Sequence, residues 1–93
     1  MEIKQSLKNE IAVLSISGKM MGGPETQLVH EHIKTLLSNG IHHVILDMAE
    51  LDWLNSSGLG ILIASFTTLK KENGSLVLAN AGRKTKELLE MTR

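Results

Sequence analysis

Residues 54–63, LNSSGLGILI, combine two serines and two glycines with an apolar run. Such a stretch can form a nucleophile turn, a phosphate-binding loop, a serine phosphorylation site or a plain helix start. A serine hydrolase turn requires Gly-x-Ser-x-Gly, and neither Ser56 nor Ser57 has a glycine two residues before it. A Walker loop ends in Gly-Lys-Ser/Thr, and GLGILI has no lysine. We therefore expect neither a catalytic serine nor a Walker-type nucleotide site here.

The four histidines are the next candidates for chemistry. His30 and His32 are two residues apart on an expected helix, so their side chains point apart. His42 and His43 are adjacent at an expected strand start and would lie on opposite faces. We therefore expect no metal site, and solvated histidines are the preferred interpretation.

Two aspartates are placed where acid–base chemistry is conceivable. Asp47 lies at the carboxyl end of an expected strand, where sites of α/β proteins often lie, and Asp52 follows it closely. The preferred interpretation of Asp47 is a loop carboxylate that accepts hydrogen bonds from local N–H groups. We expect no enzyme activity and no cofactor.

Composition limits the remaining classes of function. The chain has 93 residues, of which 42% are hydrophobic and 22% charged, an ordinary balance for one globular domain over residues 1–93. Its formal net charge is zero and its only aromatic residues are Trp53 and Phe66, so we expect no nucleic-acid partner. The first residues lack the apolar core of a signal peptide, and no apolar run approaches the ~20 residues of a membrane helix. We expect a cytoplasmic protein without direct membrane insertion.

The elements that position these residues follow from apolar periodicity and turn signals. The fold predicted is α/β, with a mixed sheet, an N-terminal β-hairpin and helices packed against the sheet, in the order ββαβαβα. We expect Gly18 to end the second strand. The predicted elements are strands 2–8 and 11–17, a helix from about Glu25 to Leu37, a strand over 43–48, a helix from about Ser56 to Lys71, a strand over 75–79, and a third helix with Leu88, Leu89 and Met91. That third helix has no stop signal before Arg93, so we expect a C-terminal truncation.

Each of the first two helices should bury an apolar face. In the first helix this face is predicted to contain Leu28, Val29, Ile33, Leu36 and Leu37. In the second helix it is predicted to contain Leu59, Leu62, Ile63, Phe66 and Leu69. The opposite, uncharged stripe of the second helix consists of Ser57, Ile61, Ala64 and Thr68. Either another element of the fold covers this stripe, or a protein partner does.

Phosphorylation is the remaining chemistry for the two serines. Asn55 can cap the second helix, and a serine beside free N–H groups at the positive helix end can carry a phosphate at low cost to the fold. A charge close to −2 would then lie beside the uncharged stripe and repel or block a partner. Loop packing is the more common role of a pair such as Met20 and Met21, and an adaptable contact surface is the alternative.

These residues resemble the signature of a known family. The motif of STAS domains, especially bacterial anti-sigma factor antagonists, is Asp-Ser-Ser-Gly-Leu/Ile-Gly after a strand. This chain is similar to it at residues 55–60, NSSGLG, which follow LDW. The order of elements also resembles that family, whose final strand and helix this chain apparently lacks.

The resemblance implies a partner switch. In the family, the unphosphorylated antagonist binds an anti-sigma factor, often a serine kinase, and thereby releases the sigma factor for transcription. The kinase phosphorylates the first serine of the motif, here Ser56, and binding is lost until a phosphatase restores it; Ser57 is the alternative phosphosite. The expected partner-binding residues are Met20, Met21, Gly22, Gly23, Asn55, Ser56, Ser57, Gly58, Ile61 and Ala64.

Two positions differ from the family pattern. Asn55 replaces the aspartate of the motif, and it can cap a helix without adding a negative charge. Met21 replaces a carboxylate common in the loop before the first helix. Both differences favour an alternative role, namely a structural STAS module in a signalling scaffold or a lipid-transporter complex. A third reading is a small-molecule or nucleotide-binding domain that uses Gly22, Gly23 and the start of the second helix.

Overall fold

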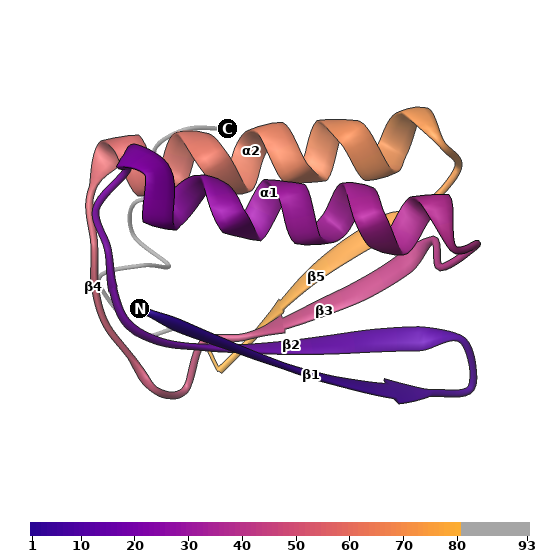
Figure 1. Ribbon diagram of the computed structural model, residues 1–93, viewed down its shortest axis with the longest axis horizontal. Helices are drawn as coiled ribbons and strands as arrows, with labels where there is room; N and C mark the ends of the chain where they lie inside the picture. Colours follow the sequence, from indigo (N-terminus) through magenta and orange to yellow (C-terminus); the bar gives the residue numbers. More distant parts are fainter. Residues whose placement is uncertain (81–93) are drawn as a thin grey trace.

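The computed structural model describes residues 1–80, and the third predicted helix lies outside this range. The described elements are β1 (Glu2–Lys8), β2 (Ile11–Met20), α1 (Gly23–Ser38), β3 (His43–Asp47), β4 (Leu51–Leu54), α2 (Ser56–Lys71) and β5 (Ser75–Ala79) (Figure 1). The α/β class, the N-terminal hairpin and the mixed sheet are confirmed.

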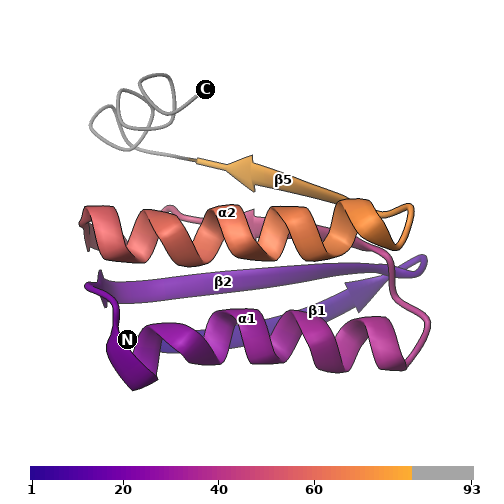
Figure 2. The same ribbon diagram turned by 90° about the horizontal axis from the view of Figure 1, so that it is seen from above.

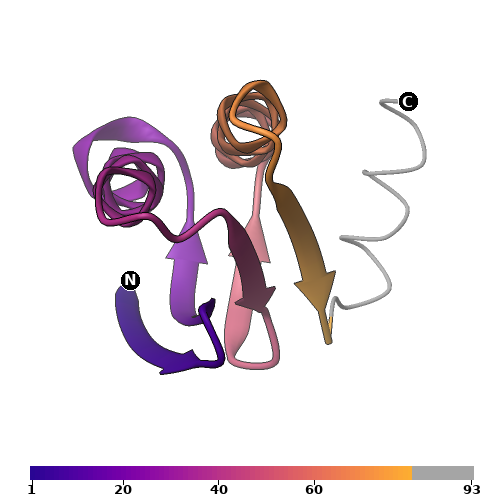
Figure 3. The same ribbon diagram turned by 90° about the vertical axis from the view of Figure 1, so that its right-hand side faces the viewer.

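The sheet has the order β1-β2-β3-β5, with β4 paired to the end of β2. β1 and β2 are antiparallel, whereas β3, β4 and β5 join through parallel pairings. The two helices lie side by side on one face of the sheet (Figures 2 and 3). Parallel neighbours require crossover connections, and α1 and α2 provide them.

The observed order of the described elements is ββαββαβ, because the sequence analysis missed β4. This strand has four residues, and its Asp52 and Trp53 are both exposed, so it carries no alternating apolar pattern. The prediction that Gly18 ends β2 is wrong. The strand continues to Met20, with a register shift between Gly18 and Lys19, and this extension is what pairs with β4.

The hairpin turn between β1 and β2 is confirmed at Asn9 and Glu10. Both residues have positive φ, 51° and 67°, as a two-residue turn that matches strand twist requires. Helix α1 begins at Gly23, two residues before the predicted start, and Pro24 lies in its first turn, where a proline costs no helical hydrogen bond.

The core lies between the sheet and the helices, where alternate residues of β2 and β3 point toward the helices. Its buried hydrophobic residues are Ala12, Leu14, Ile16, Met20, Val29, Ile33, Leu36, Val44, Leu46, Met48, Leu54, Leu59, Leu62 and Leu69. Most of the predicted helix stripes are therefore confirmed.

Of the other four stripe residues, Leu37 is partly buried and packs against the core, and three are exposed. Leu28 of α1 is 55% exposed, and Ile63 and Phe66 of α2 are each 45% exposed. In α2 the buried face is rotated toward Gly58 and Ser65, which the hydrophobicity pattern does not mark. Ser65 can be buried because its hydroxyl donates to the Ile61 carbonyl at 2.9 Å.

Candidate functional site

The candidate site is the corner where β2 leads into α1 and β4 leads into α2. β2 and β4 are parallel neighbours, and Met20 lies opposite Leu54 at their ends. The residues that follow, Met21 and Asn55, consequently leave the sheet side by side. The end of β2, β4 and the starts of both helices lie together on the left of Figure 1. Thirty-four positions of sequence separate Met21 from Asn55, and the pairing of β2 with β4 brings them together.

Asn55 holds the two segments together with both ends of its side-chain amide. Its Oδ1 accepts a hydrogen bond from the Gly58 N–H at 2.8 Å, which caps α2 as predicted. Its Nδ2 donates to the Met21 carbonyl at 2.9 Å. Its backbone N–H also donates to the Met20 carbonyl at 3.3 Å. An aspartate could make the first of these bonds but not the second, because a carboxylate is an acceptor only.

Two glycines allow the loop and α2 to touch. A Cβ on Gly58 would overlap the Met20 carbonyl oxygen, so only glycine fits where α2 crosses the end of β2. A Cβ on Gly22 would lie 2.6 Å from the Ser57 Cβ, and Gly22 has a positive φ of 88°. Gly60 is different: it is exposed, and nothing lies within 4 Å of the position of a Cβ. Packing within the described residues therefore does not require glycine at position 60.

The two serines differ in their surroundings although both are exposed. Ser56 is the first residue of α2, directly after the cap. Ser57 packs its Cβ against Gly22 of the loop. The first turn of α2 contains no acidic residue, so no side-chain carboxylate offsets the positive end of the helix there.

The other expected contact residues divide into exposed and covered positions, and Met20 is covered, because it is fully buried in the core. Met21 and Gly23 are exposed and surround Gly22. Ile61 and Ala64 are partly buried, and Ile61 packs against the core.

Farther along the uncharged stripe of α2, His30 of α1 covers Thr68, with Nε2 2.8 Å from Oγ1. The reading in which another element covers the stripe thus holds for its C-terminal part. At its N-terminal part, Ser57 is exposed beside the loop.

The histidines and Asp47 have structural partners. His30 contacts Thr68 and His32 contacts Gln5, so these two rings point apart as predicted. Burial lowers the pKa of His30, and the positive charge of Lys34 lowers it further.

The Asp47 carboxylate accepts a hydrogen bond from Asn80 Nδ2 at 3.0 Å and one from the Ala49 N–H at 3.1 Å. The hydrogen bond from Asn80 lowers the pKa of Asp47 most, and the bond from Ala49 lowers it further. The prediction of a local N–H acceptor is confirmed for Asp47.

Comparison with known proteins decides the family. The STAS domain family model matches residues 2–93. This chain belongs to the STAS domain family. The match extends over nearly the full sequence, and it agrees with the resemblance at residues 55–60.

Several solved structures share the fold. The anti-sigma factor antagonist SpoIIAA in its unphosphorylated form is 17% identical and superposes with a TM-score of 0.82, covering 97% of this chain and 83% of that one. The Bacillus cell fate determinant SpoIIAA in the phosphorylated form gives 17% identity, a TM-score of 0.81 and coverage of 98% and 83%. An anti-sigma factor antagonist from Mycobacterium paratuberculosis is 22% identical and superposes with a TM-score of 0.78, covering 98% of this chain and 76% of that one. At these identities the likeness establishes the fold.

Neither of the two described helices is long and apolar enough to cross a membrane. Sequence reasoning found the cap at Asn55 but missed its second hydrogen bond. The only signal was the asparagine itself, whose amide N–H group distinguishes it from the family's aspartate.

Proposed function

We propose that this STAS protein is an anti-sigma factor antagonist: a binding protein, not an enzyme, that captures an anti-sigma factor and so releases a sigma factor for transcription. The observation that carries the proposal is the corner assembled by Asn55. It presents an exposed serine, Ser56, next to an exposed loop at one end of the molecule. Likeness in fold to anti-sigma factor antagonists supports the same conclusion.

The corner has the properties of a preorganised contact surface. Asn55 fixes the loop carbonyl of Met21, and the Gly22–Ser57 contact fixes the loop against α2. A partner that binds here does not have to order either segment, which lowers the entropic cost of association. Gly60 adds a place where a partner's backbone can approach α2 closely.

Phosphorylation of Ser56 is proposed as the control. The hydroxyl lies at the positive end of α2, where a phosphate gains from the helix dipole and meets no acidic residue of the first turn. The folded protein therefore tolerates the modification. A partner seated on Met21 and Gly60 would meet about two added negative charges and would be released. SpoIIAA has been solved in both phosphorylated and unphosphorylated forms, which supports this type of switch.

Ser56 is preferred to Ser57 because of the loop. A phosphate on Ser57 would start from a Cβ already in contact with Gly22, whereas Ser56 is free of that contact. The proposed partner is an anti-sigma factor with serine kinase activity, and a phosphatase would regenerate the binding form.

The test combines the protein with a candidate kinase from its own genome and ATP, followed by phosphosite mapping and a binding assay. We expect phosphate on Ser56, none on the Ser56→Ala variant, and unchanged labelling of Ser57→Ala. Ser56→Ala should still bind the kinase, and Ser56→Asp should bind at least about tenfold more weakly. Absence of both a complex and a phosphate would refute the proposal.

One observation favours a second function, a structural STAS module in a scaffold or lipid-transporter complex. Asn55 uses its amide N–H to lock the loop, so this position serves structure in a way an aspartate cannot. Under this alternative, the protein would copurify with a large assembly or a transporter, and kinase treatment would leave that association unchanged.

A further inference from the structure

Strand β1 lies at the edge of the sheet that residues 1–80 form. β1 pairs with β2 along all seven residues, and among the strands that residues 1–80 form it has no other neighbour. An edge strand leaves backbone N–H and C=O groups free, and proteins usually protect it with a proline, a bulge, a very short strand or charged side chains, lysine above all. β1 carries two lysines, Lys4 and Lys8. β1 contains no proline, its pairing is regular, and it is longer than an average strand.

The side chains of β1 divide cleanly between the two faces of the sheet. Ile3, Gln5 and Leu7 lie opposite Ile16, Leu14 and Ala12, which are buried beneath the helices. The remaining residues of β1 point to the face away from the helices, and these are Glu2, Lys4, Ser6 and Lys8. The charges of the strand are therefore all on one face.

We propose that a second copy of this chain pairs with β1 in antiparallel orientation, giving a two-fold symmetric dimer with one continuous sheet. The axis passes beside Gln5, so that each Gln5 faces its own copy. Glu2 then lies opposite Lys8 of the second copy, and Ile3 lies opposite Leu7. Residues opposite one another in an antiparallel pair share a face of the sheet. Ile3 and Leu7 therefore meet on the face that carries the helices, and Glu2 and Lys8 meet on the other face. Opposite charges and apolar pairs placed in this way stabilise a sheet.

The sequence of β1 selects this register over its neighbours. Moving the axis one residue toward the start of the strand centres it on Lys4 and places two lysines opposite each other. Moving it one residue the other way centres it on Ser6 and places Lys4 opposite Lys8. Like charges directly opposite are destabilising. Of these three arrangements, only the one centred on Gln5 places no two lysines opposite each other.

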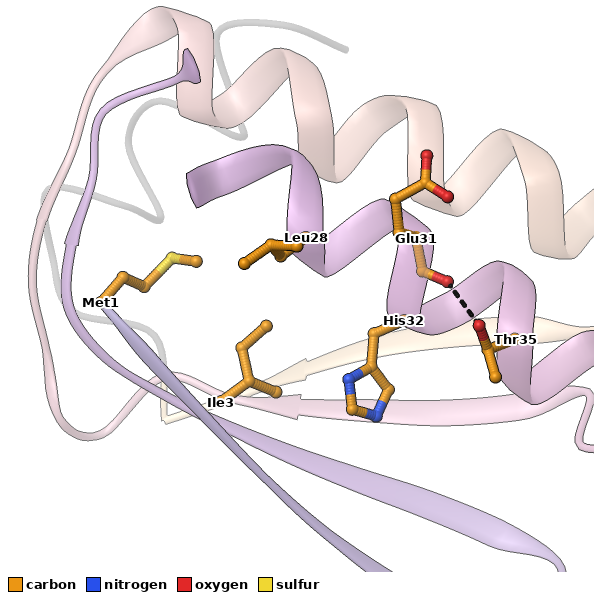
Figure 4. Close-up of a pocket in the computed structure, with 6 residues that line it drawn as sticks. All are labelled: Met1, Ile3, Leu28, Glu31, His32 and Thr35. Atoms are coloured by element: carbon orange, nitrogen blue, oxygen red, sulfur yellow. Dashed lines mark hydrogen bonds between the residues drawn. The ribbon is translucent and has the colours of Figure 1, made fainter. Parts of the chain in front are cut away.

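A groove lies beside the free edge of β1. It has a volume of about 380 Å³ and lies between β1 and the outer side of α1. Figure 4 shows Met1, Ile3 and Leu28 converging at its apolar end, while the polar end is formed by Glu31, His32 and Thr35. Leu28 is 55% exposed in the described chain.

The proposed register fills this apolar end. Leu7 is 56% exposed and points to the same face as Ile3. In the dimer, Leu7 of the second copy lies opposite Ile3, next to Leu28. Two exposed leucines that the fold leaves in water thus become buried together, and symmetry repeats the contact on the other copy.

A charge-exchange experiment tests the dimer, with sedimentation or light scattering as the readout of mass over a wide concentration range. The wild-type protein should move toward twice the monomer mass as concentration rises. Glu2→Lys alone and Lys8→Glu alone each place like charges opposite, and each should raise the dimer dissociation constant by at least about tenfold. An equimolar mixture of the two variants should dimerise again, because each chain supplies the charge that the other lacks.

The controls separate the interface from general charge effects. Lys71→Glu makes the same change of charge as Lys8→Glu, but at the exposed end of α2, and should leave dimerisation unchanged. At concentrations low enough for every protein to be monomeric, all variants should keep the wild-type melting curve, since the substituted side chains are exposed in the monomer. A wild-type protein that stays monomeric throughout overturns the proposal, including the case in which the edge binds only a strand from another protein. Single variants that dimerise as tightly as wild type, or a mixture that does not recover, also overturn it.

Discussion

The side chain of Asn55 connects two segments of the candidate site. Its carbonyl oxygen caps α2, and its amide nitrogen binds the loop carbonyl of Met21. The cap could be predicted from the sequence, because asparagine before a helix is a strong signal. The second bond could not, because it depends on β4 delivering Asn55 to the end of β2. A four-residue strand with two exposed side chains gives no such warning.

Replacing Asn55 by aspartate should separate these two roles. We expect Asn55→Asp to keep the cap to Gly58 and gain from the helix dipole, while losing the bond to Met21 and facing its carbonyl oxygen with a carboxylate. The losses and gains are each about 1 kcal/mol, so the free energy of unfolding should change little. Amide hydrogen exchange at residues 21–23 should become faster.

Asn55→Ser is the matched control, because serine caps a helix but cannot reach the loop as an amide does. It should likewise loosen residues 21–23. Unchanged exchange in both variants would show that the Met21 bond does not hold the loop.

Helix α2 packs closely against the end of β2 because Gly58 has no side chain. The helix wheel predicted Leu59, Leu62 and Leu69 correctly, because leucine at helical spacing marks a core. It misplaced Ile63 and Phe66, because the small residues Gly58 and Ser65 also point to the sheet and turn the buried face toward themselves. Hydrophobicity alone does not register a glycine that is buried to allow close approach.

Two alanine substitutions on α2 should therefore have opposite effects. Gly58→Ala forces a Cβ onto the Met20 carbonyl and should lower the free energy of unfolding by about 1–3 kcal/mol. Gly60→Ala meets open space and should raise it by up to about 1 kcal/mol through helix propensity. Urea denaturation measures both.

The same pair also informs on function. Gly60→Ala should weaken capture of the proposed partner despite its greater stability, because the added methyl group lies on the proposed contact surface. Equal stability changes in the two variants would contradict the packing described at Gly58.

For the whole molecule, the contact between α1 and α2 makes stability depend on pH. Burial, reinforced by Lys34, lowers the pKa of His30 below its usual value of 6.5. The unfolded chain therefore takes up this proton at a higher pH than the folded one. Stability from the neutral ring is complete above pH 6.5 and is lost as pH falls through the lower pKa of the folded state.

His30→Gln should remove this part of the pH dependence. Unfolding free energies measured from neutral pH down to about pH 5 should fall less steeply in the variant than in the wild type. Parallel curves for wild type and His30→Gln would show that this histidine does not contribute.

The fold as a whole was largely predictable because hairpin, helices and buried strands each carry their own periodic signal. The corner of the candidate site was predictable only in its serines and its cap. Its remaining geometry comes from β2 changing partners, from β3 over residues 11–15 to β4 over residues 18–20. Such a change of partner is a property of the assembled sheet and leaves no local mark in the sequence.

That change of partner also has a mechanical consequence. β2 is held by seven registered pairs to β1 and by five to β3, but only three join it to β4, with a shift among them. A pull on the start of α2, such as the proposed partner would exert as it leaves, would be transmitted to the end of β2 through these three pairs and the hydrogen bonds of Asn55. Under load the corner should therefore yield first, while the hairpin and the rest of the sheet keep their shape.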